Sequence, residues 1–162
     1  MNANKQENKN DGQAIRSFIK LFNENEKNKS SELLMIILSL CYHSNFLVPC
    51  NVYISDADKE RFMNANIGDT VTPTDNIRMK PDILQSGDEL FFPIFTNCEQ
   101  MGDNYNNHFS KIEMDFPSVM ENISARGDLS GIVIDAFTSP LVISKDTFEL
   151  IQKLESNKQE GH

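Results

Sequence analysis

The sequence has no tryptophan, few glycines and no long apolar run. Its three cysteines, Cys41, Cys50 and Cys98, are an odd number without paired spacing, which excludes a disulfide framework and favours a reducing compartment. The longest apolar stretch, residues 33–41, is far shorter than the roughly 20 residues that span a bilayer. The polar N-terminus has no apolar core of a signal peptide. These absences predict a cytoplasmic protein that does not cross a membrane.

Positive charge is also scarce. Lys and Arg number 15 against 24 Asp and Glu, which gives a formal net charge of -9. This balance argues against nucleic acid, because neutralising phosphates needs clustered Lys and Arg, and against anionic membrane surfaces. The charge can serve solubility alone, but it also favours a basic partner. We therefore expect a protein or peptide partner, no nucleic acid, no membrane, and a monomer or weak homodimer.

The chain is long enough to bury a core as one domain without disulfides or metal. Residues 1–12, rich in Asn, Lys and Gln, are predicted to form a disordered leader. Residues 13–155 are predicted to form the domain, and residues 156–162 a flexible tail. No internal repeat and no linker divides the domain.

Hydrophobic periodicity predicts helices and strands in a mixed order. The first helix, from residue 13, has an apolar face that either packs on the domain or docks on a partner; the face consists of Ile15, Phe18, Ile19 and Phe22. Further helices are expected at 32–43, 55–64, 117–126 and 145–154, and strands at 46–54, 77–83, 90–95, 111–116, 131–137 and 141–143. Because short turns separate several strands, we predict an α+β fold, a mixed and mostly antiparallel sheet of about five or six strands with helices packed on it.

One segment, residues 91–100, identifies the fold best. Its apolar strand contains Pro93, which has no N–H to donate and therefore suggests a bulge. Thr96 and Glu99 have the spacing of a capping box, so the strand is predicted to pass directly into a short helix. The fold-motif residues of this segment are Phe92, Pro93, Phe95, Thr96 and Glu99. Their ordinary structural roles argue against a catalytic site here.

Three stretches follow the order of a known family. ELFFPIFTNCE at 89–99 is similar to the pattern F-x-P-V-F-T-S-x-E, and a buried helix leads into FLVP at 46–49 before GIVIDAF at 131–137. Over about residues 31–154 the chain resembles the N-terminal domain of the SseB (enhanced serine sensitivity) family. The family usually has Asn-Pro where this chain has Asp135-Ala136. The resemblance implies a small bacterial cytoplasmic domain without an established enzymatic activity, and it supplies no catalytic or cofactor-binding residues.

No catalytic or metal-binding constellation stands out. Cys41 lies on an apolar helix, where a free thiol behaves as a small buried hydrophobe. Cys98 is expected in the first turn of the capped helix, where the helix dipole favours a thiolate. A zinc site needs three or four converging ligands, which three scattered cysteines with His43 and His108 do not supply. We expect no metal and no cofactor.

The polar segment 103–109 is the best candidate interaction site. It is expected to be a loop that carries two aromatic side chains in a hydrophilic setting, and exposed aromatics often anchor interfaces. The alternative is that both rings fold back onto the core. The candidate interaction residues are Tyr105, Phe109, Asp103 and His108.

Three functional hypotheses follow from these patterns. The first is a non-enzymatic protein- or peptide-binding or adaptor domain that uses the acidic surface and the aromatic loop. The second is an immunity-like or chaperone-like protein that neutralises a basic toxin or effector. The third, from a different class, is a small thiol-dependent enzyme that uses Cys98.

Overall fold

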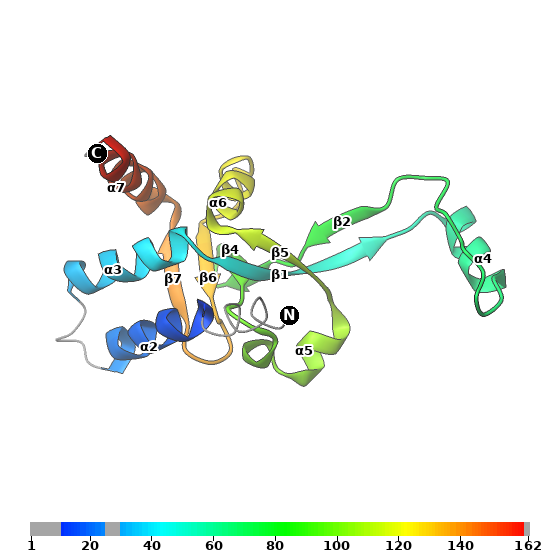
Figure 1. Cartoon of the computed structure of the whole chain (residues 1–162), viewed down its shortest axis with the longest axis horizontal. Helices are drawn as coiled ribbons and strands as arrows, with labels where there is room; N and C mark the ends of the chain where they lie inside the picture. The colour runs from blue at the N-terminus through cyan, green and yellow to red at the C-terminus, as the bar shows by residue number, and fades with distance from the viewer. Residues whose placement is uncertain (1–10, 25–29, 161–162) are drawn as a thin grey trace, which may run out of the picture.

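The computed structural model describes residues 11–24 and 30–160 and confirms the α+β class (Figure 1). The helices are α2 (Asp11–Glu24), α3 (Ser31–Tyr42), α4 (Asp56–Asn64), α5 (Asp103–His108), α6 (Phe116–Ser124) and α7 (Phe148–Glu160), with the 3-10 turns η2 (Cys98–Met101) and η3 (Lys145–Thr147). The strands are β1 (Asn45–Tyr53), β2 (Arg78–Pro81), β3 (Leu84–Ser86), β4 (Glu89–Ile94), β5 (Ser110–Asp115), β6 (Gly131–Ile134) and β7 (Leu141–Ser144).

These strands form two sheets rather than one. The three-stranded sheet has the order β2-β1-β5 and is antiparallel throughout. The four-stranded sheet has the order β3-β4-β6-β7, in which only β4 and β6 run parallel. Leu47 in β1 and Phe95, just after β4, join the sheets by exchanging two backbone hydrogen bonds of 2.8 and 2.9 Å.

The core lies between the four-stranded sheet and the helices. Side chains from α2, α3, α6 and α7 pack with β1 and with one face of the sheet in a single apolar cluster. The N-terminal helix joins this cluster through Ile15 and Ile19, which are fully buried. The first helix therefore packs on its own domain, as one of the two alternatives predicted.

Pro93 fits into β4 without a bulge, contrary to the prediction. The register with β6 is continuous, with Pro93 opposite Val133. The carbonyl of Ile94 accepts from the Asp135 amide on the β6 side, so by alternation the nitrogen of Pro93 faces away from β6. On that side β3 pairs only as far as Phe91, so no ladder hydrogen bond is lost at Pro93.

Several predicted boundaries are wrong. The first ten residues of the predicted leader lie outside the described residues, but residues 11–12 already belong to α2. The tail is helical to residue 160, because α7 is longer than expected. The segment 103–108 is the helix α5 rather than a loop, and β6 ends at Ile134 instead of continuing to Phe137.

Candidate functional site: the open face of the four-stranded sheet

The two faces of the four-stranded sheet have different surroundings. Residues alternate between faces along each strand, and Phe92, Ile132 and Ile143 lie on the inner face within the main core. The opposite, outer face carries Phe91 and the cross-strand pair Val133 and Val142. These outer residues do not belong to the main core cluster. They are therefore either covered by another part of the chain or exposed to solvent.

One end of the outer face is covered by the segment that follows β4. Phe95 is fully buried there, and its ring lies 5.7 Å from that of Tyr105 and 5.7 Å from that of Phe137. Met101 of η2 is also fully buried, although it lies outside the main core cluster. The Thr138 hydroxyl donates to the Gln100 side chain at 2.8 Å, which ties the loop after β6 to η2. A second, small apolar cluster therefore closes this end.

The other end of the outer face is an open hollow of about 530 Å³. It is lined by Leu84, Gln85, Ser86, Glu89, Phe91, Val133, Ala136, Phe137 and Val142. Val142 is 53% exposed and Phe137 is 51% exposed, whereas Val133, which is opposite Val142 in the sheet, is only 7% exposed. Glu89 is the only charged residue in this lining. The hollow thus combines an apolar floor with a carboxylate and without a cation.

The predicted interaction residues flank this hollow rather than line it. Tyr105 and Phe109 are half-buried, with ring centroids 4.6 Å apart, and Tyr105 also packs edge-on against Phe137. Asp103 is exposed at the first residue of α5, and His108 is exposed with its ring edge against Phe109. Tyr105 therefore supports Phe137, an exposed residue that the sequence pattern placed inside a core strand, and Phe109 packs against Tyr105.

A short hydrogen bond holds Tyr105 in this position. Its hydroxyl donates to the Asp82 carboxylate, and partial burial together with this carboxylate raises the pKa of the phenol well above its ordinary value. Tyr105 therefore stays protonated and keeps donating across the whole range of ordinary pH. Tyr105 thereby holds its ring against Phe137 at the edge of the hollow.

Thr96 and Asp135 form a buried polar network next to the site. The Asp135 carboxylate accepts from the Thr96 amide at 2.9 Å and from the Thr96 hydroxyl at 2.8 Å. The same hydroxyl accepts from Arg16 of α2 at 3.0 Å. Asp135 is almost fully buried and has a φ of 50°, a left-handed conformation that Asp and Asn tolerate better than most residues. The network fixes α2 and the loop after β6 to the end of β4.

The predicted capping box is wrong. Asn97, not Thr96, caps η2, and its side chain accepts from the Gln100 amide at 3.2 Å. Glu99 is exposed and its side chain does not return to Thr96. The Thr96 side chain is instead committed to Asp135 and Arg16, which are 39 and 80 residues away in the sequence.

The cysteines differ in surroundings as predicted. Cys41 and Cys50 are buried, and Cys98 is exposed. Burial, with a smaller contribution from the Asp135 charge, raises the pKa of the Cys41 thiol, and burial also raises that of Cys50. Cys98 begins a 3-10 turn of four residues, which is too short for a substantial helix dipole. Among the described residues, no hydrogen bond joins its sulfur to an imidazole that could serve as a base.

A long arm extends from the three-stranded sheet. Residues 51–80, called the arm below, comprise the last three residues of β1, the helix α4, a loop and most of β2. Figure 1 shows them projecting from the body to α4 at the far end. At the tip, Ser55 caps α4 by accepting from the Asp58 amide at 3.2 Å. Asp58 is the only buried residue of α4, so the tip is held by polar contacts rather than by an apolar core.

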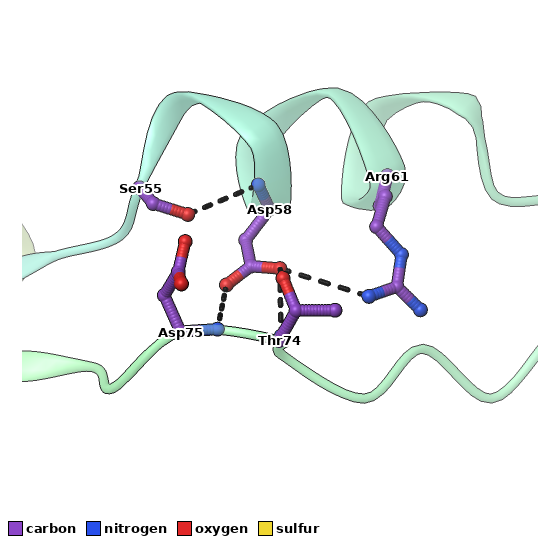
Figure 2. Close-up of polar contacts among 5 residues, drawn as sticks. All are labelled: Ser55, Asp58, Arg61, Thr74 and Asp75. Carbon is purple, nitrogen blue, oxygen red and sulfur yellow. Dashed lines mark hydrogen bonds and ion pairs between the residues drawn. The ribbon is translucent and has the colours of Figure 1, made fainter.

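Figure 2 shows how Asp58 joins α4 to the returning loop. Its carboxylate accepts from the Thr74 amide at 2.8 Å, the Thr74 hydroxyl at 2.8 Å and the Asp75 amide at 2.9 Å, and Arg61 lies 3.7 Å away. The Thr74 and Asp75 amides are the main causes that lower the pKa of this carboxyl to about 2, against a smaller opposing effect of desolvation. Sequence reasoning missed this site because the partners lie 16 and 17 residues apart.

Replacing Asp58 with Asn is expected to loosen the arm tip while leaving the body folded. The amide retains one acceptor for three donors, so the Thr74 and Asp75 amides should exchange hydrogen on the order of tenfold faster. Hydrogen exchange followed by mass spectrometry or NMR measures this. Unchanged exchange at both amides would show that Asp58 does not hold the loop.

Acid should produce the same loosening in the wild-type chain. The pKa of Asp58 in the folded state lies below the ordinary aspartate value of about 3.9. The stability that the Asp58 carboxylate contributes is therefore fully present above about pH 3.9 and is lost as the pH falls through about 2. The Thr74 and Asp75 amide signals are therefore expected to titrate in this window. In Asp58→Asn the Thr74 amide signal should be independent of pH there, and a titration of that signal that persists would contradict the assignment.

A second apolar groove lies between α3 and α7. It has a volume of about 340 Å³ and is lined by Met35, Ile36, Leu38, Ser39, Leu40, Ile151, Leu154 and Glu155. The apolar sequence of α3 predicts a buried helix. Ile36 is nevertheless exposed, so α3 is not buried on all sides. Glu155 is buried and lies 3.0 Å from the His43 ring, which joins the end of α3 to α7.

No model of a known family, no curated protein and no solved structure matches the chain. Within residues 11–24 and 30–160, no helix has both the length and the apolar character needed to cross a membrane. In the same residues, no three His, Cys, Asp or Glu side chains converge where they could hold a metal ion. The fold and the site define an α+β protein of two joined sheets with one sheet face partly open.

Proposed function

We propose that the chain is a non-enzymatic binding module that takes up an apolar, positively charged segment of a protein or peptide on the outer face of its four-stranded sheet. The observation that carries this proposal is the hollow beside Phe137 and Val142. Both side chains are about half-exposed in the lining of one concave apolar hollow, and exposed apolar residues gathered in this way mark a binding site.

The charges around the hollow favour a basic segment. Glu89 lines it, Asp88 is exposed next to it, and the whole chain has a net charge of -9. Like-charged partners would be repelled and basic ones attracted on approach. A segment in which apolar residues alternate with Lys or Arg suits these surroundings, since one side of it can enter the hollow while the other meets the carboxylates and solvent.

The resemblance to the SseB family supports the non-enzymatic part of the proposal, because that family has no established activity. It also supports a bacterial, cytoplasmic setting, as does the absence of paired cysteines. The acidic surface is also compatible with an immunity-like or chaperone-like role. In that special case the bound segment belongs to a basic toxin or effector.

Selection of peptides from a random displayed library tests the proposal. The selected peptides are expected to alternate apolar and cationic residues, and Val142→Lys should weaken their binding about tenfold or more, the loss of one good contact plus charge repulsion. Lys is well tolerated on an edge strand such as β7, so the variant should fold.

Leu150→Lys is the matched control. Leu150 is 47% exposed on α7, close to the value for Val142, but it does not line the hollow. It should leave peptide binding unchanged. Selected peptides that bind both variants as well as wild type, or that carry net negative charge, would overturn the proposal.

A further inference from the structure

The arm carries many of the exposed large apolar side chains of the described residues. Thirteen large apolar side chains are exposed among the described residues, and seven of them lie on the arm: Val52, Tyr53, Phe62, Met63, Ile67, Ile77 and Met79. At the tip the buried position belongs to Asp58, whereas Met63 is 84% exposed. Exposed apolar residues gathered in this way mark a surface that another molecule covers.

The two strands of the arm separate these side chains by face. Val52 pairs with Met79, so these two side chains share one face, and Ile77 lies one residue before the start of β2. The other face carries Arg78 and Lys80, and the Lys80 ammonium lies 5.3 Å from the centre of the Tyr53 ring. The second edge of β2 has no neighbouring strand in the described sheet.

Residues 77–80 of the arm therefore read Ile-Arg-Met-Lys, an alternation of apolar and cationic residues that leads into β2, a strand with a free edge. This is the chemistry that suits the hollow, which has an apolar floor, Glu89 in its lining and no Lys or Arg. The same chain thus carries both an exposed apolar projection with two cations and a hollow with the opposite charge.

We propose that the hollow of one copy takes up β2 of the arm from a second copy, and that two copies exchange arms reciprocally. The proposal rests on the proposed function, since it names the segment that the open sheet face binds. Ile77 and Met79 enter the hollow against Val142 and Phe137, and Arg78 and Lys80 meet Asp88 and Glu89. Each copy has one arm and one hollow, so a reciprocal exchange closes with two copies and leaves neither surface open.

Light scattering coupled to size exclusion tests the stoichiometry. The wild-type chain is expected to have twice the 18.4 kDa mass of one copy at micromolar concentration. An arm variant, Ile77→Ser with Met79→Ser, and the hollow variant Val142→Lys should each be monomeric. All three side chains are between 44% and 53% exposed, so neither variant should unfold. Leu150→Lys is the control and should remain dimeric.

Mixing the two monomeric variants gives the sharper result. The intact arm of the hollow variant can enter the intact hollow of the arm variant, so an equimolar mixture should form a heterodimer that neither variant forms alone. A dimer that survives in both variants, or a mixture that remains monomeric, would overturn the exchange of arms.

The outcomes separate this inference from the proposed function. A wild-type chain that is monomeric, but binds selected peptides in a manner that depends on Val142, overturns the arm exchange and keeps the proposed function. If the exchange is correct, a selected peptide should also compete with the arm and convert the dimer into monomers. Peptide binding to an undisturbed dimer would contradict the shared site.

Discussion

Replacing Phe95 with Ala is expected to lower the free energy of unfolding by about 3–5 kcal/mol, the usual loss for a fully buried Phe. Phe95 is completely buried where β4 ends, and its ring touches those of Tyr105 and Phe137. The cavity would lie beneath α5, because the Tyr105 ring rests on Phe95. Urea denaturation measures the change, and Phe95→Leu should lose no more than about 1.5 kcal/mol, because most of the volume is kept.

Phe46→Ala separates the stability effect from the effect on the site. Phe46 is as deeply buried as Phe95 but lies in the main core, against Phe116. Both Ala variants should lose similar stability. Only Phe95→Ala should weaken peptide binding where both proteins remain folded, because Phe95 packs against Phe137 and Phe46 packs against Phe116 instead. Equal binding by the two variants would show that the second apolar cluster does not shape the hollow.

Asp135→Ala is expected to cost about 2–4 kcal/mol, from the loss of hydrogen bonds to a charged acceptor and from placing Ala in a left-handed conformation. The Thr96 amide and hydroxyl would lose their acceptor. Asp135→Gly separates the two causes, because Gly accepts the φ of 50° but supplies no carboxylate. In thermal or urea unfolding, Asp135→Asn should be the most stable of the three variants, Asp135→Gly the next and Asp135→Ala the least stable. An Asp135→Ala variant as stable as Asp135→Asn would contradict the role of Asp135 as hydrogen-bond acceptor in a left-handed conformation.

The pH dependence of Asp135→Asn gives an independent test. Burial raises the pKa of the Asp135 carboxyl above its ordinary value, although the Thr96 hydrogen bonds and the Arg16 charge oppose this. The folded state therefore binds the Asp135 carboxyl proton more tightly than the unfolded state does. The stability that this proton contributes is fully present below the ordinary pKa of about 3.9 and is lost as the pH rises through the raised pKa of the folded state. The stability of Asp135→Asn relative to wild type should therefore increase with pH across this window, opposite in sign to the acid sensitivity of Asp58. A stability difference between Asp135→Asn and wild type that does not change with pH would contradict the raised pKa of Asp135.

Local patterns predicted most of the elements because their causes are local. The helix expected at 55–64 and the strands expected at 90–95 and 111–116 all depend on residues within a few positions. The α+β class followed from their order. The division into two sheets did not, because it depends on which strands pair, and the join between Leu47 and Phe95 connects distant segments.

The site was predicted only in part for the same reason. The aromatic segment at Tyr105 and Phe109 was visible in the sequence, but its position over Phe95 and beside Phe137 depends on tertiary contacts. In the sequence, Phe137 looks like the end of a core strand because it closely follows the apolar residues of β6. The pattern Thr96-x-x-Glu99 looked like a cap because no local signal shows that Asp135 competes for the Thr96 side chain.

The central claim is that the open face of the four-stranded sheet binds a polypeptide segment. Methyl NMR of the wild-type chain during addition of a selected peptide tests it most directly. The methyl signals of Val133 and Val142 on that face should shift with the peptide, while those of Val119, fully buried in α6, should not. Saturable binding that leaves Val133 and Val142 unshifted would contradict the claim.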